Sequence, residues 1–239
     1  MLNQMSLPIG EGLNYERLRN IVSGLILLLI VSNNVAVYAL EDIPRREVFK
    51  LSSSSKLIKH LENPKREQVM QPDRVIDVFG VKKGENVADV GAGTGYFSFR
   101  LASRLGVEGK VYAVEIQDEL LDFIRKKMDA DKVTNIIPLK ASGSDPNLPQ
   151  ACCDKIIVVN TYNFISDRIT YLKNMRKALK PGGLVAIIDI DATKVKPKKR
   201  IPLPSDVIEE MKRAGFVLRE SHGFFATRYY LVFSANAIE

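Results

Sequence analysis

Residues 87–96 (VADVGAGTGY) combine an apolar run, a carboxylate and three closely spaced glycines. Glycines at positions 91, 93 and 95 allow the backbone to pass close beneath a ligand, and the start of a following helix offers free N–H donors. A dinucleotide-binding fingerprint places its third glycine where Tyr96 stands. Asp89 also departs from that fingerprint, because a carboxylate beside the site would repel a pyrophosphate. The same carboxylate suits a cationic amino group.

A second carboxylate, Glu115, ends the next β-rich run at residues 110–115. A carboxylate can accept hydrogen bonds from both vicinal hydroxyls of a ribose, and Ile116 beside it can pack on a purine face. Asp89 and Glu115 together therefore describe a ligand with an adenosine end and an ammonium end, and no phosphate.

These residues need a scaffold, and from Pro72 onward the sequence alternates strand and helix patterns. The glycine turn (residues 91–95) follows the first strand, where a doubly wound sheet binds its ligand. A short linker joins the last two strands and has no room for a helical crossover, so we expect an antiparallel pair. The predicted strands cover residues 86–90, 110–115, 134–139, 154–160, 184–190, 216–221 and 228–233. The predicted helices cover residues 75–79 and 205–211, open after the glycine turn, and begin at the caps Asp118 and Ser166.

The predicted fold class is therefore α/β, a doubly wound and mostly parallel sheet with helices on both faces and a reversed strand at its end. The chain of 239 residues fits one domain with an appendage, and 46% hydrophobic residues supply a core and exclude intrinsic disorder. We assign residues 72–239 to this domain, residues 41–71 to a helical connector and residues 1–40 to an N-terminal hydrophobic helix.

That N-terminal segment predicts contact with a membrane at some stage. Residues 21–31 are almost wholly apolar, which suits the core of a signal peptide with cleavage near Ala39 and export of the domain. Counting residues 21–40 instead gives an uncleaved anchor of just sufficient length. More basic residues follow the segment than precede it, which favours a domain that faces the cytoplasm. A buried helix of a soluble protein is the third interpretation.

Cysteine and histidine usage argues against a metal centre. Cys152 and Cys153 are adjacent and fit ordinary reduced thiols, and the two histidines are far apart, so we expect no metal. The net charge of +7 permits an anionic partner without requiring one. The basic run at residues 194–200 fits a solvated loop or contact with lipid headgroups. No aromatic platform accompanies the run in the sequence, so a nucleic-acid partner is not indicated.

Three ordered motifs resemble those of class I S-adenosylmethionine-dependent methyltransferases. They are DVGAGTGY at 89–96, VYAVEI at 111–116 and LKPGGLVAIIDI at 179–190, and the likeness covers about residues 60–236. Residues 62–76 and 148–165 resemble bacterial predicted methyltransferases near the quinone-biosynthesis C-methyltransferases. The resemblance implies a seven-stranded sheet of order 3-2-1-4-5-7-6, with S-adenosyl-L-methionine as the cofactor.

By that resemblance, Asp89 and the glycine turn would hold the methionine part of the cofactor, Glu115 the ribose, and the loop after the third strand the adenine. Asp145 precedes Pro146, which favours a turn residue over a ligand contact. Two residues that leave the fourth strand beside the expected methyl group, Asn160 and Tyr162, are candidates for catalysis, with a structural role as the alternative for each. The predicted cofactor-binding residues are Asp89, Gly91, Ala92, Gly93, Gly95, Tyr96, Glu115, Ile116, Ser142 and Asp145.

The resemblance implies methyl transfer by in-line displacement, in which alignment and proximity supply most of the acceleration. A general base is needed only if the acceptor must lose a proton early. Tyr96 or Tyr162 could steady the sulfonium through its ring or hydroxyl. We expect a small-molecule or lipophilic acceptor, such as a quinone-like ring. The alternatives are a protein methyltransferase of the isoaspartyl type and an exported, non-catalytic relative of the fold.

Overall fold

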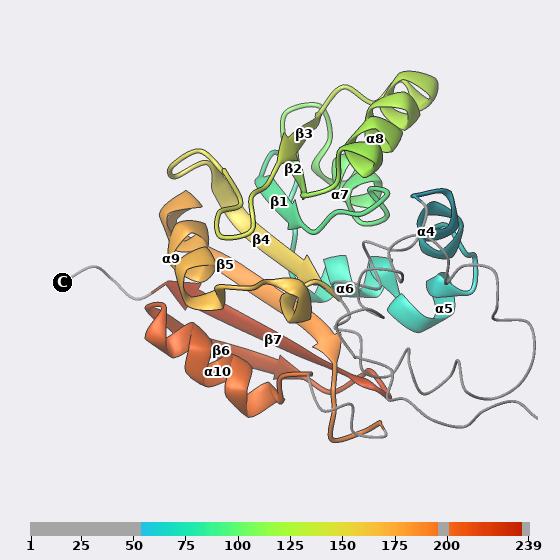
Figure 1. Ribbon diagram of the computed structural model, residues 1–239. Helices are drawn as coiled ribbons and strands as arrows, with labels where there is room; N and C mark the ends of the chain where they lie inside the picture. The colour runs from blue at the N-terminus through green and yellow to red at the C-terminus, as the bar shows by residue number, and fades with distance from the viewer. Residues whose placement is uncertain (1–53, 196–200, 236–239) are drawn as a thin grey trace, which may run out of the picture. The chain divides into compact units, whose positions relative to one another are not determined.

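The computed structural model describes residues 54–195 and 201–235 (Figure 1). All of these residues belong to one compact unit, Phe49–Glu239. The predicted N-terminal helix, its cleavage near Ala39 and most of the basic run at 194–200 lie outside the described residues. Within the described ranges, no helix is long and apolar enough to cross a membrane.

A seven-stranded sheet forms the centre of the unit, in the order β3-β2-β1-β4-β5-β7-β6 (Figure 1). Strands β1 to β5 pair in parallel, and β7 runs antiparallel to both β5 and β6. The predicted order and the predicted terminal hairpin are therefore confirmed. The strands are β1 (Asn86–Val90), β2 (Lys110–Glu115), β3 (Ile136–Lys140), β4 (Cys153–Val159), β5 (Leu179–Ile190), β6 (Phe216–His222) and β7 (Arg228–Ala235).

Helices cover both faces of this sheet and bury two separate apolar clusters. Alternate residues of β4 and β5 point to opposite faces, so Ile156 and Val185 join one cluster and Ile157 and Ala186 the other. Helices α9 and α10 contribute to the first cluster, and α6, α7 and α8 to the second. The helices are α4 (Ser54–Leu61), α5 (Arg66–Met70), α6 (Pro72–Val78), α7 (Ser98–Leu105), α8 (Asp118–Asp131), α9 (Arg168–Ala178) and α10 (Pro204–Arg213), with the 3₁₀ helix η2 (Tyr162–Phe164).

Three helix starts differ slightly from the sequence prediction. Helix α8 has Gln117 at its N-cap, so Asp118 is its first residue and not its cap. Helix α9 is capped by the Asp167 carboxylate, which accepts from the Thr170 N–H at 3.2 Å, so Ser166 is not the cap. The glycine turn does not lead directly into a helix, because α7 begins only at Ser98, with Phe97 at its N-cap. The glycine turn, residues 91–95, is therefore non-helical, and two residues separate it from the first residue of α7.

The segment predicted as a helical connector is helical over α4 and α5. Leu57 of α4 is 5% exposed and Met70 of α5 is 1% exposed, so both helices pack against the rest of the unit through apolar side chains. Residues 41–53 of the predicted connector lie outside the described part of the chain. Cys152 and Cys153 are free thiols, as expected.

Candidate active site

The carboxyl ends of β1, β2 and β4 bring the main predicted residues to one edge of the sheet. Strand β1 lies between β2 and β4, and its Val90 is in register with Val114 and Val158. Asp89 is the second-last residue of β1 and Glu115 the last of the neighbouring β2, and Asn160 directly follows β4. Parallel neighbours at a topological switch point form the usual ligand site of such sheets.

The glycine turn has backbone conformations that require glycine. Gly91, Gly93 and Gly95 have φ values of 76°, 59° and 82°. A Cβ at Gly91 would lie 2.1 Å from Thr161 Oγ1, so a side chain there would collide with the loop after β4. The Gly91 and Ala92 N–H groups donate to the Val114 carbonyl at 2.8 and 3.0 Å, which fixes the turn to β2. The predicted turn thus passes close to both neighbouring strands.

Asp89 is a buried carboxylate without an ion pair among the described residues. Its side chain accepts a hydrogen bond from Ser98 Oγ at 2.6 Å, and the residue is 2% exposed. Desolvation by burial raises the pKa of Asp89 to about 6, despite the hydrogen bond, which favours the charged form. A bound cation would compensate this desolvation. Asp89 therefore suits the ammonium group that the sequence predicts for its ligand.

Glu115 is tied to the backbone around it. Its Oε2 accepts from the Gly93 N–H at 2.9 Å, and its Oε1 accepts from the N–H groups of Ile116 and Gln117 at 2.7 and 3.0 Å. Burial raises the pKa of Glu115, although these amides oppose that effect. A carboxylate offers about four lone-pair positions. Backbone N–H groups already occupy three of these positions. In this conformation Glu115 can therefore accept a hydrogen bond from one ribose hydroxyl, through Oε2, and not from two.

The predicted adenine loop folds into a turn beside Glu115. The Ala141 N–H donates to the Glu115 carbonyl at 2.9 Å, which places the loop next to β2. Ser142 Oγ accepts from the Asp145 N–H, and Asp145 Oδ1 accepts from the Asn147 N–H at 2.8 Å. The turn interpretation of Asp145 is thus supported. Ile116 is 52% exposed, so its apolar surface is free to pack on a base.

Asn160 occupies a strained position at the end of β4. Its φ is 52°, in the left-handed region that asparagine tolerates better than most residues. Such outliers are concentrated at functional sites. Its Nδ2 donates to Met70 Sδ at 3.4 Å, and its Oδ1 accepts from Arg228 Nε at 3.3 Å. Asn160 therefore joins α5 and β7 at the corner where the acceptor is expected.

Tyr162 lies deeper than the sequence suggested. Its side chain is 0% exposed, belongs to the cluster beneath α9 and α10, and its hydroxyl donates to Glu210 at 2.5 Å. Arg168 Nε holds the same carboxylate at 2.6 Å. Burial raises the pKa of Tyr162, and the Glu210 carboxylate raises it further. A catalytic role for Tyr162 stays a prediction, and these contacts favour the structural alternative.

Tyr96 fastens α5 to α7. Its hydroxyl donates to Glu67 at 2.8 Å, and the guanidinium carbons of Arg66 and Arg100 each lie 4.3 Å from its ring centre. Burial, followed by the hydrogen bond to Glu67, raises the pKa of Tyr96 to about 12. The ring therefore already contacts two cations, and its predicted contact with a sulfonium stays a prediction.

Two arginines near this edge were not predicted. The Arg66 guanidinium stacks on the ring of Tyr96, which directly follows the glycine turn. Arg228, at the start of β7, donates a hydrogen bond to Asn160. Arg66 lies in the stretch 62–76 noted for its resemblance, but that resemblance does not place it at the site, and Arg228 belongs to none of the motifs. Only the tertiary fold reveals them.

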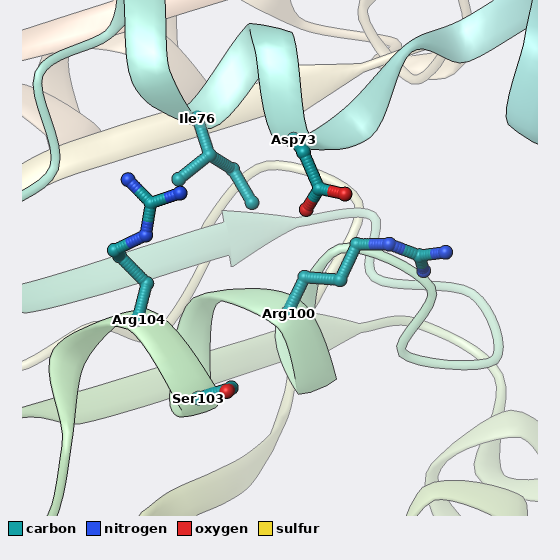
Figure 2. A pocket seen from close by; sticks show the side chains of 5 residues that line it. All are labelled: Asp73, Ile76, Arg100, Ser103 and Arg104. Carbon is teal, nitrogen blue, oxygen red and sulfur yellow. The ribbon is translucent and has the colours of Figure 1, made fainter.

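A separate cleft of about 310 Å³ lies between α6 and α7 (Figure 2). None of its lining residues was predicted for the cofactor. The two arginines in it are already paired, Arg100 with Glu67 at 2.5 Å and Arg104 with Asp77 at 2.6 Å. The cleft therefore does not have the character of an anion site. Among the residues whose positions are described, no cluster of histidine, cysteine and acidic residues could hold a metal ion. The cleft is lined by Asp73, Ile76, Arg100, Ser103 and Arg104.

Comparison with known families decides which ligand fits this edge. The model of the ubiE/COQ5 methyltransferase family matches residues 65–221, which include α5, the glycine turn and the loop after β4. The chain belongs to the ubiE/COQ5 methyltransferase family. Among curated proteins, a ubiquinone/menaquinone biosynthesis C-methyltransferase (UbiE) of Idiomarina loihiensis is 30% identical over 115 residues, which cover 48% of this chain and 46% of the relative. UbiE of Francisella tularensis subsp. novicida is 30% identical over 132 residues, 55% of this chain and 50% of the relative. The chain thus matches about half the length of these relatives.

Solved structures agree with the family. A SAM-dependent methyltransferase from Aquifex aeolicus superposes with a TM-score of 0.70 at 26% identity, over 76% of this chain and 98% of that one. A TehB-like SAM-dependent methyltransferase from Corynebacterium glutamicum has a TM-score of 0.60 at 16% identity, over 77% of this chain and 100% of that one, which shows the fold alone. This member of the ubiE/COQ5 family is therefore a SAM-dependent methyltransferase, and S-adenosyl-L-methionine is its cofactor.

The residues at the carboxyl edge fit that cofactor. Asp89 is a desolvated carboxylate for the ammonium group, and Oε2 of Glu115 has a lone pair for a ribose hydroxyl. A Cβ on Gly93 would lie 3.1 Å from the Leu61 side chain, so a residue larger than glycine would be crowded at this point of the turn. The individual contacts are proposals that rest on this fit.

Proposed function

We propose that this methyltransferase transfers the methyl group to a carbon atom of a small, lipophilic acceptor with a quinol-type ring. The observation that carries the proposal is the match to the ubiE/COQ5 family across the site itself, residues 65–221. The printed names of the curated relatives specify C-methylation in ubiquinone and menaquinone biosynthesis. Because the chain spans about half of each relative, the acceptor class is carried over as a proposal.

In this proposal, each strand end has a separate task. Asp89 binds the ammonium group of the cofactor, Glu115 accepts from a ribose hydroxyl, and Ile116 packs on the adenine. The backbone of the adenine loop and the Ser142 hydroxyl lie at the adenine edge. The glycine turn passes beneath the methionine part. Asn160 lies at the corner that faces the acceptor, between Met70 and Arg228.

The bound cofactor supplies an electrophilic methyl group on a sulfonium. A ring carbon of the acceptor would supply the electron pair for the new bond to the methyl carbon, and S-adenosylhomocysteine and the ring proton would be the leaving products. The amide of Asn160 cannot accept a proton near neutral pH, so its contribution is to orient the acceptor. Alignment and proximity therefore supply the acceleration.

The acceptor and the methylated atom can be tested together. The full-length chain is incubated with methyl-¹³C-labelled cofactor and a demethylated benzoquinol or naphthoquinol, and the product is analysed by carbon NMR and mass spectrometry. We expect a methyl group bonded to ring carbon. An O-methyl ether would contradict C-methylation. Labelling of an isoaspartyl peptide but not the quinol would support the protein methyltransferase instead.

We also propose that residues 21–40 bring the enzyme to a membrane, with residues 72–239 on the cytoplasmic side. The proposal rests on the apolar run and on the basic residues that follow it. A lipophilic acceptor would be found in the same membrane. Fractionation of cells that express the chain with a C-terminal reporter should place the reporter in the membrane fraction, protected from external protease. A cleaved and exported reporter would contradict this topology.

A further inference from the structure

We infer that Arg66 of α5 binds the α-carboxylate of the cofactor and, with Asp89, forms a two-charge site for its amino acid end. The inference rests on S-adenosyl-L-methionine as the cofactor and adds a residue that comes from outside the strand ends. It also gives α5 a role in cofactor binding, although that helix lies outside the motifs of the glycine turn and of β2.

Arg66 is held against the glycine turn. Its guanidinium carbon is 4.3 Å from the ring centre of Tyr96, the residue that follows Gly95. Its Nη1 donates to the carbonyl of Leu61, the last residue of α4. The Leu61 side chain in turn lies 3.1 Å from the position of a Cβ on Gly93. The segment that joins α4 to α5 therefore packs against the part of the glycine turn along which the methionine end of the cofactor would lie.

Arg66 forms no ion pair within the described ranges, although its guanidinium stacks on the Tyr96 ring. Arg100, Arg104 and Arg168 each pair with a carboxylate at 2.5 to 2.6 Å. Arg66 is partly buried and forms no such pair with any residue of the described ranges. Burial lowers the pKa of Arg66, whereas Tyr96, Glu62 and then Asp89 raise it. Arg66 and Asp89 thus lie within each other's electrostatic reach without a direct contact.

The amino acid end of the cofactor has the complementary charges. Its ammonium and carboxylate are attached to one carbon, so a matching site needs an anion and a cation a few ångströms apart. Asp89 is the anion, buried beneath the turn, and Arg66 is the cation that approaches from α5. A guanidinium can bind a carboxylate through two parallel hydrogen bonds, which fixes orientation as well as charge.

Helix α5 is fastened so that Arg66 stays in place. Glu67, the next residue, accepts from the Tyr96 hydroxyl at 2.8 Å and pairs with Arg100 of α7 at 2.5 Å. At the other end of α5, Met70 is 1% exposed and contacts Asn160 through its sulfur. The helix is therefore tied to both the cofactor side and the acceptor side of the carboxyl edge.

The test compares two ligands that differ by one carboxylate. S-adenosylhomocysteine and its decarboxylated analogue, 5′-deoxy-5′-(3-aminopropylthio)adenosine, are titrated by calorimetry into the full-length chain and its Arg66→Met variant. We expect the wild type to prefer S-adenosylhomocysteine by about tenfold or more, and the variant to lose that preference while keeping its affinity for the analogue. Arg66→Lys should recover part of the preference, because it restores the charge without the planar fork.

The matched control is Arg74→Met on α6. Arg74 also stacks at 4.3 Å on an aromatic ring, that of Phe224, but hydrogen-bonds to Gln71 rather than to the corner at Leu61. This variant should keep the preference of the wild type. If Arg66→Met weakens both ligands equally, or neither, the carboxylate contact is wrong while the cofactor assignment stands. If the wild type binds neither ligand, both fail.

Discussion

Two aspartates at opposite edges of the parallel sheet, Asp154 and Asp89, differ in their ionic partners. At the amino edge, Lys155 at the start of β4 pairs with Glu85 at 2.6 Å, and Lys180 pairs with Asp154 at 2.7 Å. At the carboxyl edge, Asp89 forms no ion pair with any residue in the described ranges. Lysines therefore neutralise Glu85 and Asp154 at the amino edge, whereas no described cation pairs with Asp89.

The aspartates of the two edges show the difference most clearly. Burial raises the pKa of Asp154, but the Asn86 amide and the Lys180 ammonium outweigh it, so the pKa lies below its usual range. Burial raises the pKa of Asp89 to about 6, and the hydrogen bond from Ser98 does not offset it. One carboxylate therefore stabilises the ligand-free fold, and the other opposes it at neutral pH. A group that opposes folding is a candidate for function.

Alanine in place of glycine should give the largest difference in stability between the two edges. Gly91 at the carboxyl edge and Gly182 near the start of β5 have φ values of 76° and 77°, so alanine is strained equally at both. Only at Gly91 would the Cβ collide, at 2.1 Å from Thr161 Oγ1, whereas nothing lies within 4 Å at Gly182. We expect Gly91→Ala to lower the free energy of unfolding by about 3–4 kcal/mol and Gly182→Ala by about 1 kcal/mol, measured by urea denaturation. Equal losses would contradict the close approach of the turn to the loop after β4.

Lys155→Met should damage the amino edge alone. The side chains of Lys155 and Glu85 are 10% and 18% exposed, so the variant leaves Glu85 largely desolvated without its partner. We expect the free energy of unfolding to fall by about 2–3 kcal/mol, with the affinity for S-adenosylhomocysteine unchanged at temperatures where the variant is folded. A large loss of affinity in the folded variant would show that the two edges are coupled.

Asp89→Asn should weaken cofactor binding without lowering the stability of the fold. The substitution keeps a partner for Ser98 but removes the charge that faces the ammonium group. We expect the dissociation constant for S-adenosylhomocysteine to rise by about tenfold or more, and Glu115→Gln to raise it similarly. Stability at neutral pH should not fall, because a desolvated charge is removed. Asp154→Asn is the control at the other edge, and near wild-type affinity in both carboxyl-edge variants would remove these residues from the site.

The pH dependence gives the smallest of these effects. With a pKa of about 6, Asp89 loses most of its charge by about pH 5.5, and cofactor affinity should fall by about fourfold from about pH 7.5. The ligand-free protein should respond in the opposite direction. The folded pKa lies above the ordinary value of 3.8, so protonation favours folding, fully below about pH 4, and this contribution is lost as the pH rises through about 6. Thermal melts and titrations across this range would check both trends, and Asp89→Asn should flatten them.

The sequence predicted the fold and the strand-end carboxylates well, because both depend on local pattern. The apolar runs and the short last linker predicted the strands and the antiparallel end pair, and the resemblance to class I methyltransferases implied the sheet order. Asp89 and Glu115 lie near the carboxyl ends of strands that pair in parallel. The backbone N–H groups that occupy Glu115 were not predicted. Two of them belong to the residues that directly follow Glu115, and their directions depend on how the chain leaves β2.

Residues beyond the strand ends were harder to predict for a physical reason. Tyr162 follows β4 by three positions, and the 3₁₀ turn there directs its ring toward Glu210 in the core, a choice that the sequence pattern does not specify. Arg66 and Arg228 reach the site from segments before β1 and at the start of β7. Their contribution depends on tertiary packing, which local spacing does not encode.

The most direct test of the carboxyl edge as a cofactor site is calorimetric titration of the full-length chain with S-adenosylhomocysteine, with NAD as the comparison ligand. We expect micromolar binding of S-adenosylhomocysteine at one site per chain and none of NAD, since a carboxylate beside the turn repels a pyrophosphate. A folded protein that binds neither ligand, or that prefers NAD, would contradict this assignment.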